Sequence, residues 1–135
     1  MTHVLDTNAV SALMKGSAAV IDRLAATGPG DVAIPPPVVA EIAYGIERLP
    51  RSRRRQALQA RFDLVCSQLP RVGWDDAVSQ AYGRIKAHLE RRGRRIEDVD
   101  AAIAAHALAV GAILVTSSTS HMARVPGLHV EDWNR

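Results

Sequence analysis

The sequence has one cysteine, few aromatic residues and no long apolar run, and each of these absences excludes a class of protein. A single cysteine, Cys66, cannot build a disulfide framework, and no cysteine–histidine spacing resembles a zinc site. Aromatic residues make up 4% of the chain, which argues against a platform of exposed rings for stacking bases. No apolar run reaches the ~18 residues of a membrane-spanning helix. Residues 1–6 also lack the features of a signal peptide, so we expect a cytoplasmic protein with no membrane association.

Length and composition predict one ordinary globular domain. The chain has 135 residues, of which 47% are hydrophobic and 23% charged. A chain of this length buries enough surface to form a proper core, so we expect residues 1–135 to form a single domain.

The basic residues give the first indication of a partner. The formal net charge is +3, and all but two of the 17 basic residues are arginine. The arginines gather between residues 48 and 61 and between residues 84 and 95. Because the planar arginine fork suits phosphate, this pattern indicates a polyanionic partner. The alternative is that these arginines only cover the solvated faces of helices.

The pattern of apolar residues predicts short strands that alternate with helices. Strands are expected at residues 2–6, 32–34, 112–115 and 128–130. Helices are expected from a cap at Asn8 to about Lys15, from Ser17 to Thr27, from the prolines at 35–37 to Pro50, from Arg51 to about Cys66, from Asp75 to Gly93, and over residues 99–110. The last of these is apolar nearly all round and is expected to be buried, with Gly111 as its C-terminal cap. This alternation predicts an α/β fold with a parallel sheet.

Three acidic residues stand where a site could form. Asp6 follows the first strand directly, at the edge of a parallel sheet where ligands usually bind. Asp100 lies in the first turn of the buried helix, and Glu41 lies among apolar neighbours one turn into the helix after the prolines. Each has a structural alternative: a helix cap for Asp6, a favourable helix-terminal charge for Asp100, and a buried salt bridge for Glu41.

The three acids together favour a metal site. No basic residue lies near any of them in the sequence. Carboxylates about 4 Å apart would repel one another by ~4 kcal/mol per pair at an effective dielectric constant of 20. A divalent cation relieves that repulsion, and oxygen ligands without clustered histidines indicate Mg²⁺ or Mn²⁺. His106 and Cys66 are interpreted as structural residues.

Several segments resemble one family of nucleases. Leu5-Asp6-Thr7-Asn8 and the segments 39–46, 100–108, 114–119 and 125–128 resemble, in this order, the PIN-domain ribonucleases, and more narrowly the VapC-type toxins of toxin–antitoxin pairs. The resemblance implies a three-layer fold in which a short parallel sheet is flanked by helices. It implies that Asp6, Glu41 and Asp100 are the catalytic acids that bind Mg²⁺ or Mn²⁺, and that RNA is cut by an activated water, leaving a 5′-phosphate. It also implies a homodimer that is silenced by an antitoxin protein inserted into the active-site groove.

The sequence departs from the family pattern at one position. Ser118 stands where the family often has Asp or Asn, so we expect it to be a weak metal ligand. Asp98 is an additional acid that could compensate, although helix capping is its expected task. Thr7, Asn8 and Thr116, together with Ser118, are expected to orient the acids.

Other functions stay open at this point. One is a basic RNA-binding or adaptor domain without catalysis, in which the acids are structural. Another is a phosphotransfer domain with Asp6 as nucleophile, although Asn8 stands where haloacid-dehalogenase-type enzymes have a second acid. For the nuclease we expect the RNA backbone to contact Arg53, Arg54, Arg91 and Arg94.

Overall fold

The fold is built on a short parallel sheet. The computed structural model describes residues 1–134. Its strands are β1 (His3–Leu5), β2 (Val32–Ala33), β3 (Ile113–Val115) and β4 (Val130–Glu131), hydrogen-bonded in the order β2-β1-β3-β4. All three pairings are parallel, and Val4 at the centre pairs with Ala33 on one side and Leu114 on the other. The α/β class and the parallel sheet are therefore confirmed.

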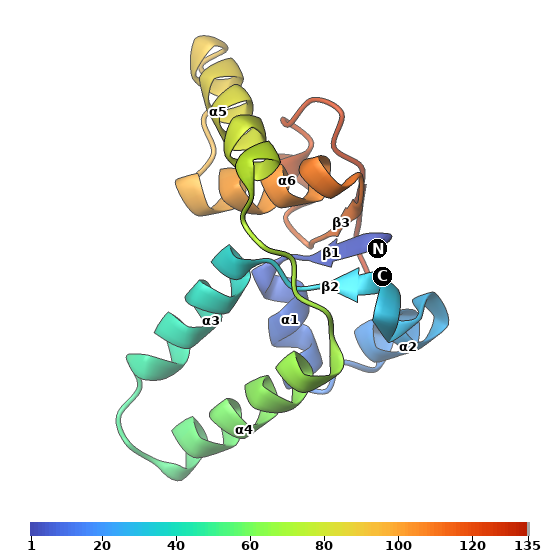
Figure 1. Cartoon of the computed structure of the whole chain (residues 1–135). Coiled ribbons are helices and arrows are strands. Elements are labelled where there is room, and N and C mark those ends of the chain that lie inside the picture. The colour runs from blue at the N-terminus through green and yellow to red at the C-terminus, as the bar shows by residue number, and fades with distance from the viewer. Residues whose placement is uncertain (135) are drawn as a thin grey trace.

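Helices cover both faces of this sheet and make three layers. In chain order they are α1 (Thr7–Met14), α2 (Ala18–Thr27), the 3₁₀ turn η1 (Pro29–Asp31), α3 (Pro36–Glu47), α4 (Arg53–Gln68), α5 (Asp76–Arg91), α6 (Asp98–Val110) and α7 (Thr119–Met122). Figure 1 shows α5 and α6 on one side of the sheet and α1 to α4 on the other. Among residues 1–134, no helix is long and apolar enough to cross a membrane.

The core forms where α6 packs on the sheet. Every residue from Ala101 to Ala107 is buried, as expected for a helix that is apolar nearly all round. Most of these residues are alanines, which allow close approach to α5 and to the strands. Gly111 ends α6 with a φ of 68°, a left-handed conformation that suits glycine, and the chain turns into β3. The first turn of α6, which carries Asp100, is thereby fixed at one end of the sheet.

Two helix starts differ from the expectation. Asn8 lies inside α1, and Asp6 caps that helix by accepting a hydrogen bond from the Thr7 backbone N–H. Asp98 does not cap α6 either: it is the first helical residue, and its carboxylate pairs with Lys86 Nζ on α5 at 3.1 Å. In both cases an acid earlier in the chain, Asp6 or Glu97, stands at the N-cap position, and only Asp6 makes a side-chain capping hydrogen bond.

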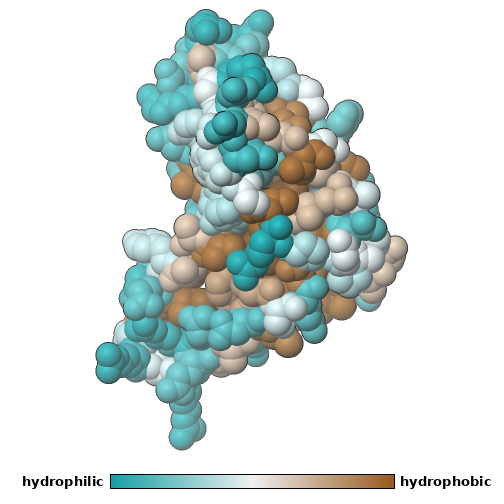
Figure 2. All heavy atoms as spheres, in the orientation of Figure 1, coloured by the Kyte–Doolittle hydropathy of each residue, from teal (hydrophilic) through white to brown (hydrophobic). Residues whose placement is uncertain are grey.

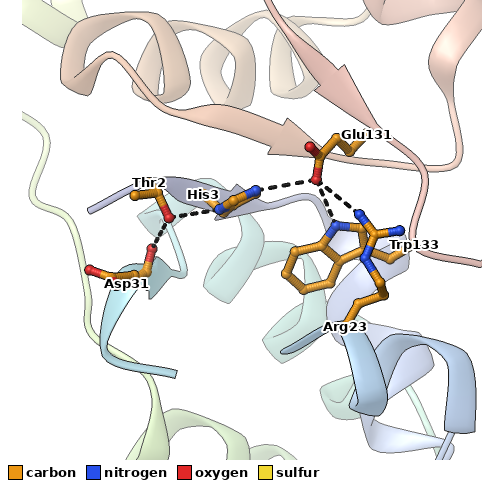
Figure 3. A network of polar contacts seen from close by, with 6 residues as sticks. All are labelled: Thr2, His3, Arg23, Asp31, Glu131 and Trp133. Atoms are coloured by element: carbon orange, nitrogen blue, oxygen red, sulfur yellow. Dashed lines mark hydrogen bonds and ion pairs between the residues drawn. The ribbon is translucent and has the colours of Figure 1, made fainter. Parts of the chain in front are cut away.

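The C-terminal segment is held against the rest of the fold by side chains that meet around Trp133 (Figure 3). The last strand begins at Val130, two residues later than expected, and Trp133 is only 1% exposed. The indole N–H donates to Glu131 Oε1 at 3.0 Å, and His3 and Arg23 reach the same oxygen at 3.2 and 3.3 Å. The Trp133 hydrogen bond, supported by His3 and Arg23, lowers the pKa of Glu131. These contacts anchor the segment to β1 and α2.

Candidate functional site

Asp6 is the most firmly held of the three acids. It follows β1, is 3% exposed, and uses both carboxylate oxygens. Oδ1 accepts the Thr7 backbone N–H at 2.7 Å, and Oδ2 accepts the Thr116 hydroxyl at 2.7 Å and the Asn8 side-chain amide at 3.4 Å. Charged acceptors in such hydrogen bonds are held strongly, so the direction of this carboxylate is fixed before any ligand arrives. Asp6 therefore caps α1, which was the structural alternative to a site residue, and it also belongs to a polar cluster.

Glu41 lies at the rim of the site and not in the core. Its neighbours in sequence are apolar, but they point to different faces of α3, and Ala40 and Tyr44 are exposed. The side chain of Glu41 is half-buried and accepts a hydrogen bond from the Thr7 hydroxyl of α1. The alternative of a buried salt bridge was therefore wrong, because Glu41 forms no ion pair among residues 1–134.

Asp100 joins these two acids in one cavity. A pocket of about 480 Å³ is lined by Asp6, Glu41 and Asp100, together with Thr7, Asn8, Ser11, Ala12, Lys15 and Ser118. Burial raises the pKa of Asp100, and the negative charges of Asp6 and Glu41 raise it further. The tertiary structure therefore brings together three acids that are up to 94 residues apart in sequence, and their charges act on one another.

Hydrogen bonds connect the polar residues around these acids. The Asn8 side-chain oxygen accepts the Ser117 backbone N–H at 3.0 Å, and the Ser118 backbone N–H donates to the Thr116 hydroxyl oxygen at 2.9 Å. Thr116 is 1% exposed, so its hydroxyl is fixed between Asp6 and the start of α7. Ser118 itself lines the cavity. Thr7, Asn8 and Thr116 thus hold the acids or the loop beside them.

Asp98 lies outside the cavity. Its carboxylate is 64% exposed and is paired with Lys86, and it is absent from the cavity wall although Asp100 is only two residues away. Residues two apart on a helix point to different faces, which explains the separation. We therefore assign Asp98 to the contact between α5 and α6 and not to the acidic site.

Lys15 and Ser11 belong to the cavity wall, and the sequence reasoning did not find them. Thr7, Ser11 and Lys15 follow one another at intervals of four residues and so share one face of α1. That spacing, counted from Thr7, was the available signal in the sequence. Lys15 brings an exposed cation to the mouth of a cavity that is otherwise lined by acids and neutral side chains.

The four arginines that we expect to contact the RNA backbone lie in two separate parts of the structure. Arg53 and Arg54 begin α4, whereas Arg91 ends α5 and Arg94 follows it. Hydrophilic side chains cover both the free end of α5 and the connection between α3 and α4, at opposite ends of the molecule (Figures 1 and 2). The surface is hollowed between the part that carries α5 and α6 and the part that carries α3 and α4 (Figure 2).

The donor set of the cavity fits a hard divalent cation. Carboxylate, hydroxyl and amide oxygens line it, whereas neither cysteine nor histidine does, and such oxygens are the preferred ligands of Mg²⁺ and Mn²⁺. Burial is the main cause of the raised pKa of Asp100, and a cation would relieve the smaller contribution that the charges of Asp6 and Glu41 make. Within residues 1–134, no group of three or more acidic, histidine or cysteine side chains is arranged so that it could hold a metal ion, so Asp6, Glu41 and Asp100 share the cavity without forming a ready ligand set.

His106 and Cys66, which the sequence analysis interpreted as structural residues, lie away from this cavity. His106 is fully buried in α6 and packs edge-to-face against the Trp74 indole at a centroid distance of 5.3 Å. Neither of its ring nitrogens has a hydrogen-bond partner among the described residues, and burial lowers its pKa. Cys66 is half-buried against the core, and its burial raises the pKa of the thiol. Both environments agree with structural roles.

The three-layer fold that carries the acidic cavity at one edge of its parallel sheet is also found in a known family of proteins. The model of the PIN domain family matches residues 3–128, and the chain belongs to this family. It is 31% identical to ribonuclease VapC2 of Rickettsia felis over 100% of both chains, and 32% identical to the tRNA(fMet)-specific endonuclease VapC of Shigella flexneri over 99% of both. The crystal structure of VapBC2 from Rickettsia felis bound to a promoter DNA fragment superposes with a TM-score of 0.87 at 29% identity, covering 98% of this chain and 99% of that one.

Proposed function

We propose that this protein is a divalent-metal-dependent endoribonuclease and the toxin of a toxin–antitoxin pair. The observation that carries the proposal is the single cavity that Asp6, Glu41 and Asp100 share and in which their charges are coupled. Full-length similarity to proteins named ribonuclease VapC2 and tRNA(fMet)-specific endonuclease VapC supports RNA as the substrate. RNA phosphodiesters and an acidic cavity repel each other, which is the situation that a bound Mg²⁺ or Mn²⁺ resolves.

The residues present divide the work of hydrolysis among them. Asp6 and Asp100 would hold the cation, since Asp6 is fixed by three donors and Asp100 faces the same cavity. When bound, the cation would lower the pKa of a water molecule and offset charge in the transition state. Glu41, held by the Thr7 hydroxyl at the rim, would act as a further ligand or orient the attacking water. In-line attack by water leaves a 5′-phosphate and a 3′-hydroxyl.

The remaining polar residues would keep this arrangement in place. Thr116 and Asn8 fix Asp6, and Ser118 would supply a weak oxygen ligand to a second cation. Arg53, Arg54, Arg91 and Arg94 would bind the RNA backbone without reading its sequence.

Two protein partners follow from the same proposal. A groove of about 260 Å³ continues from the acidic cavity between α1, α3 and α4, where the apolar side chains Met14, Ile42, Ile46 and Leu58 line it. The similar Rickettsia felis protein was crystallised as VapBC2, which supports an antitoxin as partner of this chain too. We propose that a segment of the antitoxin occupies the groove and blocks the acids, and that the toxin is a homodimer.

Metal dependence and product chemistry test the catalytic proposal. Purified protein incubated with bacterial RNA and Mg²⁺ should produce fragments whose downstream ends carry a 5′-phosphate, and EDTA should abolish cleavage. Replacing the 2′-hydroxyl at the scissile nucleotide should not block the chemistry, because water and not that hydroxyl is the nucleophile. Cleavage in EDTA, or a 2′,3′-cyclic phosphate product, would contradict the roles of all three acids.

A matched pair of variants in one helix sharpens this test. Asp100→Asn should lower the cleavage rate by at least ~100-fold, as expected when charge stabilisation is removed from an active site. Asp98→Asn makes the same chemical change two residues away, outside the cavity, and should keep most of the activity. RNA binding without any metal-dependent cleavage would favour the non-catalytic binding domain instead.

A further inference from the structure

A second cavity, larger than the acidic one, lies at the C-terminal end of α5. Its volume is about 520 Å³, and it is lined by His88, Leu89, Arg92, Arg94, Ser120, Ala123 and Arg124. No acidic residue lines it. Within residues 1–134, none of its three arginines forms an ion pair with a carboxylate. We call this cavity the arginine pocket.

The backbone places two of these arginines on the pocket. Arg92 caps α5, and Gly93 then adopts a φ of 65°, which turns the chain back on the helix. The turn is closed by hydrogen bonds from the Gly93 N–H to the Glu90 carbonyl at 3.1 Å and from the Arg94 N–H to the Leu89 carbonyl at 2.9 Å. This capping structure sets Arg92 and Arg94 on either side of the glycine, with both facing the same cavity.

The third arginine comes from a distant part of the chain. Arg124 follows α7, and its Nη1 donates to the Arg95 carbonyl oxygen at 3.0 Å, which restricts the guanidinium group. The helix dipole favours a positive charge at the C-terminal end of a helix, which accounts for Arg92 at the end of α5. It does not account for Arg124, which comes from the segment after α7. Guanidinium groups from two separate segments therefore converge without an anion from the described residues to balance them.

We propose that the arginine pocket binds a backbone phosphate of the RNA substrate, close to the bond that is cut. Guanidinium groups pair with phosphate oxygens through two parallel hydrogen bonds, and the Ser120 hydroxyl adds a further donor to the pocket wall. The inference rests on the proposed ribonuclease function, because that function makes RNA the polyanion that the protein meets. It goes beyond that function because it assigns RNA binding to Arg92 and Arg124 in addition to Arg94.

The position of the pocket beside the acidic cavity favours RNA over an acidic protein segment. Ser118, the N-cap of α7, lines the acidic cavity, and Ser120 in the first turn of α7 lines the arginine pocket. The two residues are at most about 7 Å apart along the chain and point to different sides of it, so the start of α7 forms part of the wall of each cavity. A single strand repeats its phosphates at short intervals and so can occupy both at once. The pocket also has few apolar side chains, only Leu89 and Ala123, for a peptide to contact.

The salt dependence of RNA binding tests this assignment without relying on cleavage. The probe is a short fluorescent oligouridylate, and the protein carries Asp6→Asn so that it cannot cut the probe. Each phosphate contact that is lost should reduce the magnitude of the slope of log K against log salt concentration by ~0.7 for single-stranded RNA. Arg92→Gln/Arg94→Gln should therefore reduce it by ~0.7, the contribution of one phosphate, and Arg94→Gln by a measurable part of that, at an unchanged melting temperature.

Control variants separate the pocket from general charge. Arg71→Gln removes the same charge from an exposed residue that lines neither cavity and should leave the slope unchanged. Arg94→Lys keeps the charge and should keep most of the slope. Equal slopes for Arg94→Gln and for the parent overturn the assignment, and so does a pocket variant that loses binding of oligoglutamate but not of oligouridylate, since the occupant is then an acidic protein segment. A chain that binds RNA through the pocket but never cuts it contradicts the proposed function alone.

Discussion

The Thr116 hydroxyl donates a hydrogen bond to Asp6 Oδ2 at 2.7 Å, which joins residues from the ends of β3 and β1. Both side chains are buried, at 1% and 3% exposure, so water cannot replace either partner. Because the strands are parallel neighbours in register, the residues that follow Leu5 and Val115 meet at the same edge of the sheet. The candidate catalytic acid is therefore oriented by the pairing of the two central strands.

Thr116→Val should weaken both the fold and the site. It keeps the shape of the side chain but leaves Asp6 Oδ2 with only the 3.4 Å contact from the Asn8 amide, which costs about 1–3 kcal/mol of unfolding free energy. Denaturant unfolding measures that loss, and cleavage should fall because Asp6 is free to turn away. Thr116→Ser keeps the hydroxyl and is the control. A valine variant as stable and as active as the wild type would show that this hydrogen bond does not hold Asp6 in place.

Divalent cations should stabilise the fold through the acidic cavity. A ligand that binds only the native state adds ~2.7 kcal/mol at a hundredfold excess over its Kd, so Mg²⁺ or Mn²⁺ should raise the melting temperature of the wild type. Asp6→Asn/Asp100→Asn should abolish the rise, whereas Asp98→Asn, whose carboxylate pairs with Lys86 elsewhere, should keep it. The shared site is refuted if the cation raises the melting temperature of the double variant as much as that of the wild type.

Ser118→Asp should strengthen the binding of a second cation. Ser118 lines the acidic cavity, and a carboxylate is a better ligand for a hard cation than a hydroxyl. Calorimetric titration with Mn²⁺ should resolve an additional or tighter site, while the cleavage rate changes by less than about tenfold because one cation suffices for the chemistry. One identical site in both proteins would rule out this position as a ligand.

Buried His106 should make stability depend on pH in the acidic range. Burial lowers its pKa below the ordinary value of 6.5, while Asp75 opposes the shift. The unfolded chain therefore binds the proton more readily, so stability is complete above about pH 6.5 and is lost as the pH falls below it, by at most about 1.4 kcal/mol per pH unit. Neither ring nitrogen has a hydrogen-bond partner among the described residues, so protonation would bury a charge that nothing there hydrogen-bonds.

Two histidine variants test this assignment. Unfolding free energies measured between pH 5 and 7 should vary less in His106→Leu than in the wild type. His129→Leu removes an exposed histidine and should leave the pH profile as it is. At neutral pH, His106→Leu should retain most of the cleavage activity as long as it folds, because His106 lies outside the acidic cavity. A pH profile that is unchanged in His106→Leu would assign the acid sensitivity to other groups.

Local patterns in the sequence determined most of the elements of this protein. The apolar stretch at 99–110 is the buried helix α6, and Gly111 ends it as expected, because helix burial and glycine caps depend on residues within a turn of each other. Strand positions near residues 3, 32 and 113 follow from short apolar runs for the same reason. The residues that resemble PIN-domain nucleases likewise stand in short contiguous segments.

Contacts between distant segments were decided only by the tertiary structure. No local rule distinguishes Asp98, which pairs with Lys86, from Asp100, which faces Asp6 and Glu41, because the rotation of α6 against α5 and the sheet sets which face each residue occupies. Trp133 is buried because Glu131, His3 and Arg23 meet it from three elements, and the preceding polar residues gave no sign of that. Packing of whole elements, which minimises exposed apolar surface while satisfying buried polar groups, settles such contacts.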